Sequence, residues 1–584
     1  MLRVTKKLLY ILTKKQRRFT FVLVVLMLLG GIMESLSVSL MLPLVTAIME
    51  SETWKNEWYS QIICKLFHVS NQRQYVIVLL VILIIVFVLK NAYLIFEYKI
   101  QYTFIGRCRY QMQSELIHSY IRKPYSFYLS ADHGEIVRII DNDVTGAFNL
   151  LTSVLTFYTE IVVSIILSVT IMVMSPKMAI GMTLVLLIEL LIIAKVIKPF
   201  MRKTGDNHRE QAAIANKWLL QSLNGIKSIK VSKKEDYFES NYKIHAKQNS
   251  NYIAKYQTYT NLPRLLIEAF TIAGVLVIMF ILVIGGAELE SLVPQLSAFI
   301  VAAIRLLPSV NRMSSSINQI PFYEGGIDAI NRVVKNLDIP ESPADECQLK
   351  NKNDISFFSK EILVKDISFS YPDSEKVVLD KAEMVIKAGQ SVGIIGPSGS
   401  GKTTTVDIIL GLLNPMKGKV LVDGVDILDE LPEWLSHLAY IPQSIFLVDD
   451  TIRANIAFGI DEKDISDDKV MKVLEESQLA DYIRELPNGI DTTVGEQGVR
   501  LSGGQRQRIG IARALYTNPD VLVFDEATSA LDNETEAAIM ESINHLKGKK
   551  TLIIIAHRMT TIENCDVVYR VENGKINKVK GEKT

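Results

Sequence analysis

The sequence has little cysteine and no excess of charge of either sign. Its 584 residues include four cysteines, and 64 basic side chains against 63 acidic ones leave a formal net charge of +1. Four cysteines are too few for the disulfide framework of a small secreted protein, and the balanced charge offers no basic field that would attract nucleic acid. A chain of this length exceeds what one hydrophobic core supports, so several domains are expected.

Apolar residues, by contrast, are abundant, and they gather in the first half of the chain. Hydrophobic residues make up 49% of the sequence. Before about residue 320 they form runs long enough to cross a bilayer, which takes roughly 20 apolar residues each. We predict six membrane spans, at residues 20–49, 75–98, 150–174, 178–197, 262–284 and 292–317.

The loops between these spans predict the orientation of the chain in the membrane. Loops 101–148 and 198–261 are long and rich in Lys and Arg, whereas the loops after the third and fifth spans are short and nearly free of positive charge. The positive-inside rule then places both termini and both long loops in the cytoplasm. Apolar residues at helical spacing predict that the spans continue into these loops as helices, with tips near residues 130–135 and 233–236 that can touch a cytoplasmic domain.

The N-terminus and the cysteines fit the same topology. Residues 1–18 are basic, carry no acid and are amphipathic, which predicts a cytoplasmic helix lying at the membrane interface rather than a cleavable signal peptide. Cys64 is expected outside, as a free thiol or, less favoured, in an intermolecular bridge, and Cys108, Cys347 and Cys565 are expected inside.

The character of the sequence changes near residue 334. We predict a membrane domain over residues 1–330, a proline-containing polar linker over 331–357 and a soluble domain over 358–584. In the last of these, short β-branched runs alternate with helical patterns, which is typical of an α/β domain with a parallel sheet core. The expected strands cover residues 364–370, 392–395, 419–422, 438–441, 521–524 and 551–556.

One loop of the soluble domain has the composition of a phosphate cradle. Residues 396–403 fit G-x-x-x-x-G-K-[ST] between a buried strand and a helix. Glycines let backbone N–H groups approach a polyphosphate, Lys402 reaches the β and γ phosphates, and the Thr403 hydroxyl can hold Mg²⁺. The expected nucleotide-binding residues are Gly396, Pro397, Ser398, Gly399, Ser400, Gly401, Lys402, Thr403 and Thr404.

Two acids end a later apolar strand. The run 521–524 leads directly into Asp525 and Glu526, and a buried strand that delivers a carboxylate beside a P-loop is the Walker B arrangement. Asp525 is predicted to hold Mg²⁺, directly or through water, and Glu526 to polarise the attacking water. The alternative, a strand that merely ends in surface acids, is disfavoured by the P-loop upstream.

A second anion-binding helix N-terminus is predicted at residues 501–505, where the sequence Leu-Ser-Gly-Gly-Gln opens a helix. One chain with two phosphate-cradling loops suggests a shared nucleotide. Here the sequence resembles the ATP-binding cassette (ABC) family, whose signature matches residues 501–505, and the resemblance covers essentially the whole chain. It implies a multidomain fold, with an all-α polytopic membrane domain of exporter type and six transmembrane helices, followed by an α/β P-loop NTPase domain.

The resemblance also assigns roles to residues that, taken alone, would be interpreted as ordinary structural residues. It implies ATP and Mg²⁺ as cofactors, with Tyr371 stacking on adenine, Gln443 sensing Mg²⁺ and the membrane domain, and His557 acting as the switch residue near the γ-phosphate. Without the family pattern, Tyr371 would be a turn aromatic and His557 a capped strand end. The remaining matches are Ser502, Gly503, Gly504 and Gln505 as nucleotide contacts, 529–532 as the D-loop and Glu496 as an acidic contact of exporters.

The family mechanism follows from the same resemblance. Two cassettes pack head to tail, so that ATP lies between the P-loop of one chain and the signature of the other. Because this chain holds one of each, a dimer is required, and its complete motifs favour a homodimer with two equivalent sites while leaving a heterodimer open. ATP closes the pair, and hydrolysis reopens it. One cytoplasmic domain after six spans is the exporter layout.

Arginines in the last two spans point to the cargo. Arg305 and Arg312 are seven residues apart on one helix face, no acid is near them in sequence, and Arg264 on the fifth span can join them. Guanidinium groups along a translocation path suit a phosphate or pyrophosphate. For Arg264, a pair with Glu268 along its own helix is the alternative.

The segments around these arginines carry a closer resemblance. Residues 263–268 and 305–312 are similar to those of PglK-type lipid-linked oligosaccharide flippases, in which arginines on the inner cavity wall engage the pyrophosphate of the lipid. The resemblance implies this role for the three arginines, with Lys90, where an arginine is expected, as a further candidate. Three acids in or near apolar runs have roles that the sequence leaves open: Glu34, Glu160 and Glu189.

The leading hypothesis is an ATP-driven exporter or flippase of a polyprenyl-diphosphate-linked oligosaccharide in the inner or plasma membrane. Its expected partners are a second copy of the chain, the lipid bilayer and a lipid-linked or amphipathic anionic substrate. An exporter of another lipid, a drug or a peptide is the alternative, and intramembrane arginines disfavour a cationic drug. A membrane regulator gated by ATP is a different class, which Glu526 disfavours. The predicted spans exclude a soluble cassette of DNA repair or translation.

Overall fold

The computed structural model of the chain consists of two compact units, Met1–Ile121 with Ala131–Ile339, and Arg122–Ser130 with Pro340–Thr584. The first unit is helical, and the second is mixed α/β. The structure describes residues 2–40, 44, 47–48, 58–69, 71–174, 195, 197–284, 289–335, 358–372, 374, 376–495, 498–526, 540–541, 543–556 and 562–580.

Long helices make up the first unit. Among the described residues, three helical segments are long and apolar enough to cross a membrane, at Lys14–Glu34, Gln72–Ile121 and His133–Ile166, which matches the first three predicted spans. The fifth and sixth predicted spans fall in α12 and α13, and the fourth, except for residues 195 and 197, lies outside the described residues. The elements are α1 (Leu2–Ile11), α2 (Lys14–Ser39), α4 (Trp58–Phe67), α5 (Gln72–Ile121), α7 (His133–Arg138), the π-helical turn η1 (Ile139–Asp143), α8 (Val144–Met174), α10 (Lys198–Asn224), α11 (Ile226–Ser232), α12 (Glu235–Ile284) and α13 (Leu289–Lys335).

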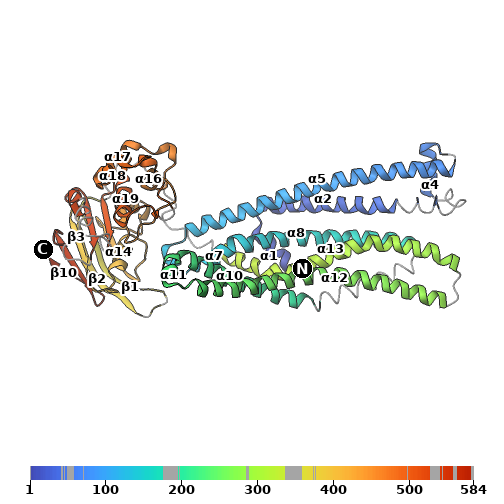
Figure 1. The fold of residues 1–584 in the computed structure, drawn as a ribbon, viewed down its shortest axis with the longest axis horizontal. Coiled ribbons are helices and arrows are strands. Elements are labelled where there is room, and N and C mark those ends of the chain that lie inside the picture. Colours follow the sequence, from blue (N-terminus) through green and yellow to red (C-terminus); the bar gives the residue numbers. More distant parts are fainter. Residues whose placement is uncertain are drawn as a thin grey trace. The chain divides into compact units, whose positions relative to one another are not determined.

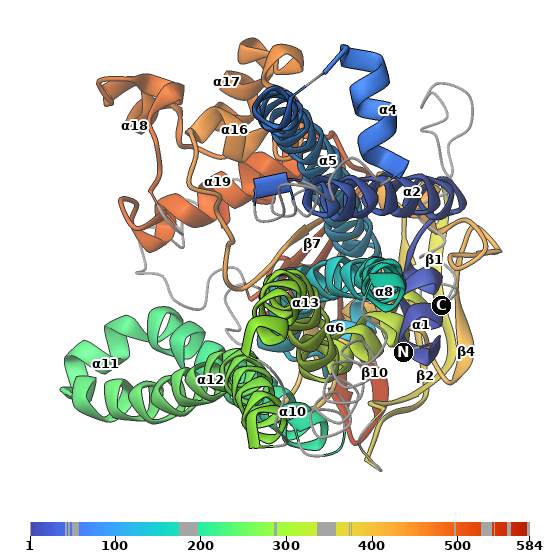
Figure 2. The ribbon, with the colours of Figure 1, turned by 90° about the vertical axis from the view of Figure 1, so that its right-hand side faces the viewer.

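Helix α8 lies in the middle of this unit. It packs against α13 on one side and against α2 and α5 on the other (Figure 1, Figure 2). The contact with α2 is close, because a Cβ atom on Gly31 would come within 2.3 Å of Val163 on α8. Small residues permit such approaches between apolar helices. Helices α10, α12 and α13 pack against one another as a second group.

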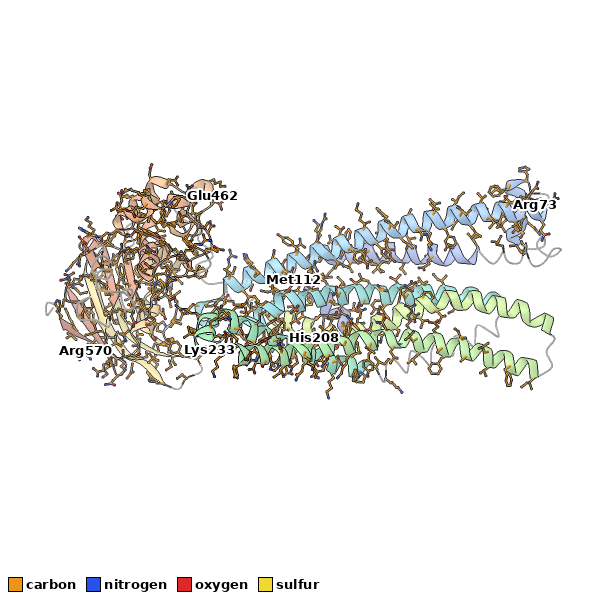
Figure 3. The ribbon with its side chains drawn as sticks, viewed as in Figure 1. Arg73, Met112, His208, Lys233, Glu462 and Arg570 are labelled. Atoms are coloured by element: carbon orange, nitrogen blue, oxygen red, sulfur yellow. The ribbon has the colours of Figure 1, made fainter. Side chains whose placement is uncertain are left out.

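The long polar loops are helical, as predicted. Helix α5 continues to Ile121, and α10 and α11 together run from Lys198 to Ser232. The second tip turns at Lys233, labelled in Figure 3, which has a left-handed backbone with φ of 49° between α11 and α12. The first loop contributes the short helix α6 (Tyr125–Tyr128) to the second unit. A piece of that loop therefore folds with the soluble domain.

A buried ion pair joins α10 to η1, the turn that precedes α8. Asp143, 4% exposed, accepts two hydrogen bonds from Arg209 of α10, both at 3.0 Å. Gly326 of α13 lies directly against this carboxylate, where a Cβ atom would approach Asp143 Oδ1 to 3.1 Å. His208, labelled in Figure 3, stacks on Phe322 of α13. These contacts join three helices whose sequences are far apart.

The N-terminal helix is amphipathic, as predicted, but protein covers its apolar face. Helix α1 packs against α13 and α8 and buries Val4 and Leu8. Lys7 forms ion pairs with Glu324 at 3.0 Å and with Asp328 at 2.7 Å, both on α13. The helix is therefore docked on its own chain, and its place at the membrane interface stays a prediction.

The second unit contains two sheets. One has six strands in the order β10-β9-β3-β8-β7-β6, parallel except for the antiparallel pair of β9 and β10. Its strands are β3 (Ser391–Ile395), β6 (Leu438–Ile441), β7 (Val521–Asp525), β8 (Thr551–Ile555), β9 (Val567–Glu572) and β10 (Lys575–Lys580). The other is antiparallel, in the order β2-β1-β4-β5, with β1 (Glu361–Ser370), β2 (Val377–Lys387), β4 (Lys417–Val422) and β5 (Val425–Asp426).

The predicted parallel sheet is confirmed, but the domain also contains a separate antiparallel sheet that was not predicted. The predicted strands at 364–370 and 419–422 became β1 and β4, which pair with each other in the antiparallel sheet. A short apolar run does not reveal which sheet it joins, because the partner strand is distant in sequence. Strands β2, β5, β9 and β10 were not predicted.

Two cores cover the two faces of the six-stranded sheet. Val521 and Val523 of β7 belong to a core with residues of α14, whereas Leu522 and Phe524 belong to a core with residues of α19. The alternation follows from the two-residue period of a strand. Helices α14 and α19 therefore cover opposite faces of β7. The helices and 3₁₀ turns of this unit, besides α6, are α14 (Lys402–Ile409), α15 (Leu431–Ser436), α16 (Ile452–Ile456), η5 (Glu462–Asp464), α17 (Asp467–Glu476), α18 (Ala480–Glu485), η6 (Gly489–Asp491) and α19 (Gly503–Tyr516).

Candidate functional site

The predicted phosphate cradle is a loop between β3 and α14. Gly396 and Gly401 hold backbone conformations with φ of 155° and 105°. A Cβ atom at Gly396 would lie 2.2 Å from the carbonyl oxygen of Val571, so the position tolerates no side chain. Lys402, 5% exposed, donates from Nζ to the carbonyl oxygens of Gly396 and Pro397, both at 3.0 Å. The loop is thus folded around the ammonium group.

This loop fits a polyphosphate. The hydroxyl of Ser400 is buried and has no hydrogen-bond partner within the described ranges. Buried polar groups are normally paired, so an orphaned hydroxyl in such a loop suits an additional acceptor. The buried ammonium of Lys402 and the N-terminus of α14 favour an anion at the same place. The residues present therefore match the phosphates of ATP.

Tyr371 lies beside the loop. Its hydroxyl is 3.0 Å from Thr404 Oγ1 on α14, and its ring meets Phe369 edge-on at 5.1 Å between centroids. The structure thus brings Tyr371 to the first turn of the helix that follows the cradle. Stacking on adenine stays a prediction.

The predicted carboxylates come together at the end of β7. Asp525, 6% exposed, accepts a hydrogen bond from the Tyr440 hydroxyl at 3.2 Å. Glu526 follows with φ of 50°, a strained left-handed conformation for a residue with a Cβ atom. Its Oε2 accepts a hydrogen bond from Gln443 Nε2 at 2.7 Å. Carboxylate and amide oxygens, with the Thr403 hydroxyl, are the oxygen ligands that suit Mg²⁺.

Asp407 also belongs to this site, although it was not predicted from the sequence. It lies one turn beyond Thr403 on α14 and is 9% exposed. Burial, together with the charge of Asp525, raises the pKa of Asp407 to about 6. Tyr125 of α6 is also near, because burial and the charge of Asp407 raise the pKa of Tyr125. The available signal was the spacing of four residues, which places Asp407 and Thr403 on one helix face.

The signature residues open α19 through a capping box. Ser502 Oγ accepts from the backbone N–H of Gln505 at 3.2 Å, and the backbone N–H of Ser502 donates to Gln505 Oε1 at 2.8 Å. Capping therefore explains two of these residue types, and Gly503 and Gly504 form the first turn. In the part of the chain that the structure describes, no hydrogen bond or ion pair joins Ser502–Gln505 to the P-loop.

Three further predicted positions, His557, Glu496 and residues 529–532, lie outside the described residues. The strand before His557 is nevertheless informative. β8 runs parallel to β7 with Ile555 opposite Asp525, and the backbone N–H of Glu526 donates to the carbonyl of Ile555 at 3.0 Å. The chain thus enters the His557 segment beside the two acids, and the switch role of His557 stays a prediction.

In the helical unit, Arg312 of α13 is paired with acids. Its Nε and Nη2 donate to the two carboxylate oxygens of Glu160 on α8, the Nη2 bond being 3.3 Å long. Nη2 also lies 3.5 Å from Glu34 Oε2 on α2. The Arg312 side chain is 39% exposed and that of Glu160 is 9% exposed. The sequence shows no acid near Arg312, because the neutralising acids come from other helices.

The other predicted cargo residues do not meet Arg312 in the contacts among the described residues. Arg264 is exposed and forms no ion pair with Glu268, its neighbour one turn along α12, which is also described. Lys90 is half-buried, with Nζ 5.0 Å from the ring centroid of Phe87. Arg305 lies on α13, and its side chain is outside the described ones. A shared arginine cluster stays a prediction.

Comparison with known proteins identifies the class. Residues 379–529 match the ABC transporter family, and residues 19–307 match the ABC transporter transmembrane region. Curated relatives span most of the chain: an ATP-dependent lipid A-core flippase of Desulfotalea psychrophila is 32% identical over 78% of both chains. One of Cupriavidus pinatubonensis is 27% identical over 80% of this chain and 78% of that relative. The chain therefore belongs to the ABC transporter family.

Within this family the chain is a half-transporter, with one membrane domain followed by one ATP-binding domain. Its fold is that of an ABC exporter. The structure of a bacterial Atm1-family ABC exporter with ATP bound matches it with a TM-score of 0.75, over 97% of this chain and 96% of that one, at 22% sequence identity.

Proposed function

We propose that this half-transporter is an ATP-driven lipid flippase. The observation that carries the proposal is the hydrogen bond between Gln443 and Glu526 beside Asp525, at the P-loop of a chain with an exporter membrane domain. A complete set of hydrolytic residues supports pumping over ATP-gated regulation. The curated relatives named lipid A-core flippases support a lipid as the cargo.

At the proposed ATP site, each described residue has a task. Lys402 would exchange backbone carbonyls for the β and γ phosphate oxygens. Thr403, Gln443 and Asp525 would hold Mg²⁺, which supplies charge neutralisation at the phosphates. Glu526 would accept a proton of the attacking water, and its fixed left-handed backbone holds the carboxylate at the end of β7 for that purpose.

A second copy of the chain would complete the site. Helices α14 and α19 cover opposite faces of β7, and among the described residues no hydrogen bond or ion pair joins Ser502–Gln505 to the P-loop, which supports a nucleotide contact on another chain. Ser502–Gln505 would then contact ATP on the partner chain. Since this chain carries both Asp525 and Glu526, a homodimer with two equivalent sites suffices.

For the cargo, the proposal is a polyprenyl-diphosphate-linked oligosaccharide. Its support is the resemblance around Arg264, Arg305 and Arg312 and the affinity of guanidinium for diphosphate. Glu160 and Glu34 engage Nε and Nη2 of Arg312, whereas no hydrogen bond or ion pair from Nη1 is seen among the described residues and the side chain is 39% exposed. Arg312 can therefore offer Nη1 to a phosphate oxygen while acids hold its other edge. Lys90 would be a peripheral cation.

A lipid A-core glycolipid is the second candidate, favoured by the names of the relatives. One experiment separates the two. The purified dimer, reconstituted in vesicles, is assayed for ATPase activity with a polyprenyl-diphosphate oligosaccharide, lipid A-core, a neutral lipid or a peptide. Selective stimulation by the diphosphate lipid is expected. Stimulation by lipid A-core alone would favour the second candidate, and stimulation by peptide alone would contradict a lipid cargo.

The proposed location is the inner or plasma membrane, with several membrane spans and both termini in the cytoplasm. The support is the apolar length of α2, α5 and the segment His133–Ile166 together with the basic long loops. ATP binding in the cytoplasm requires this orientation, because the soluble unit follows the last span.

A further inference from the structure

Tyr440 and Asp525 stand on neighbouring strands of the six-stranded sheet. β6 and β7 are parallel, and Tyr440 lies opposite Val523. Side chains alternate between the two faces of a strand, so Val523 and Asp525 point to the same face as Tyr440. This register lets the Tyr440 hydroxyl reach along the face and donate to Asp525 Oδ2 at 3.2 Å.

The same face carries a competing negative charge. Helix α14 covers it and carries Asp407, whose buried carboxyl interacts electrostatically with that of Asp525. Two carboxylates that face each other repel, so the orientation of Asp525 depends on the donors around it.

The residues that follow β6 contact the second acid, Glu526. Gln443, three residues after Tyr440, donates to Glu526 at 2.7 Å. One short segment, 440–443, thus supplies a donor to the metal-binding acid and another to the acid that polarises water. Gln443 has an assigned role by family resemblance, whereas Tyr440 has none.

We propose that Tyr440 is a positioning residue for the metal end of the ATP site, where its hydroxyl fixes the Asp525 carboxylate in the orientation that binds Mg²⁺. The inference rests on the ATPase part of the proposed function. Removing a hydrogen-bond partner of a metal ligand typically weakens metal binding by about 10–100-fold. The effect should therefore appear in metal dependence rather than in nucleotide binding as such.

The test measures the coupling between metal and nucleotide without hydrolysis. The reconstituted dimer binds a fluorescent non-hydrolysable ATP analogue in EDTA and in saturating Mg²⁺, and the ratio of the two affinities is the coupling. Tyr440→Phe is compared with Tyr569→Phe, a matched control that loses a hydroxyl from the same sheet, where Tyr569 donates to the Val385 carbonyl at 2.9 Å. Both variants keep the ring and remove only the hydroxyl, which in Tyr569 also accepts a hydrogen bond from the Val385 backbone N–H at 3.3 Å.

Tyr440→Phe should leave the affinity in EDTA unchanged and lower the coupling by about tenfold. Tyr569→Phe should leave the coupling unchanged. In an Asp525→Asn background, Tyr440→Phe should have no further effect, because it acts through that carboxylate. An unchanged coupling in Tyr440→Phe, or a full further loss when it is added to Asp525→Asn, overturns the inference.

The same data separate this inference from the proposed function. If the wild type shows neither Mg²⁺-dependent binding nor ATP hydrolysis, the ATPase proposal fails and the role of Tyr440 fails with it. If the wild type shows both and Tyr440→Phe behaves like the wild type, only the role of Tyr440 is overturned.

Discussion

Arg312 on α13 and Glu160 on α8 form a bidentate ion pair. Glu34 on α2 is near the same guanidinium, with its Oε2 3.5 Å from Arg312 Nη2. Charged groups in apolar helices are costly unless they are paired, and this pair joins helices that pack along much of their length. The structure therefore gives a role to Glu34 and Glu160, which the sequence left without one. They hold Arg312 in place and neutralise part of its charge.

The first prediction concerns the stability of this pair. Arg312→Ala should destabilise the protein, because Glu160, 9% exposed, is left without its cation. Breaking a buried pair costs roughly 3–5 kcal/mol, and the partial exposure of Arg312 places the effect near the low end. Thermal unfolding should show the loss, and the double variant Arg312→Ala/Glu160→Ala should recover part of it.

The matched control for that prediction is Lys230→Ala, which breaks the exposed pair of Lys230 and Glu235 at 3.2 Å. Exposed ion pairs contribute little to stability, so the thermal unfolding midpoint of Lys230→Ala should be close to that of the wild type. Equal loss of stability in Arg312→Ala and in the double variant would show that Glu160 does not depend on Arg312.

Asp407 predicts a pH dependence of stability. Its pKa in the folded protein is raised from 3.8 to about 6, so the folded state binds this proton more tightly than the unfolded state. Stability should then fall as pH rises from about 4 to about 6 and stay lower above that window, by an amount on the order of 2–3 kcal/mol. Asp407→Asn should flatten this decline and raise the unfolding midpoint of the metal-free protein at neutral pH.

The control for Asp407 is Asp468→Asn, an exposed acid in the first turn of α17. Thermal unfolding between pH 4 and pH 8 should show the same slope for this variant as for the wild type. A slope in Asp407→Asn that also matches the wild type would mean that Asp407 does not titrate in this window.

The cysteines test the predicted topology. Cys64 is a half-exposed free thiol, whereas Cys108 and Cys565 are 2% and 4% exposed, and burial raises the pKa of Cys565 to about 11. Buried thiols with a raised pKa react slowly. In a Cys347→Ser background, a membrane-impermeant maleimide added to intact cells should label Cys64. Additional removal of Cys64 should abolish the label, and labelling only after permeabilisation would place Cys64 inside.

The sequence predicts the parts of this protein whose chemistry is local. The P-loop needs glycine where Gly396 meets the Val571 carbonyl, and Asp525 and Glu526 end a strand that must be buried, so pattern and geometry coincide. Family resemblance assigned Gln443 and Glu526 to one site, and the structure joins them by a direct hydrogen bond, while their roles stay predictions. These features depend on residues close in sequence or on motifs with few alternatives.

What the sequence did not predict depends on tertiary contact. The pairing of Arg312 with Glu160 joins positions 152 residues apart. The roles of Tyr440 and Asp407 depend on strand register and on which face α14 covers, and neither is visible in a local pattern. The antiparallel sheet was likewise missed as a separate layer, because β1 finds its partners in β2 and β4 only after folding.

The central claim is that ATP hydrolysis in this chain moves an anionic lipid across a bilayer. The most direct measurement is the flipping of a fluorescent polyprenyl-diphosphate oligosaccharide in vesicles that contain the wild type, Glu526→Gln or Arg312→Ala. We expect ATP-dependent flipping by the wild type, none by Glu526→Gln with nucleotide binding retained, and a strong loss in Arg312→Ala. Hydrolysis should fall by at least about a hundredfold in Glu526→Gln. Flipping that persists without ATP, or in Glu526→Gln, would contradict the account.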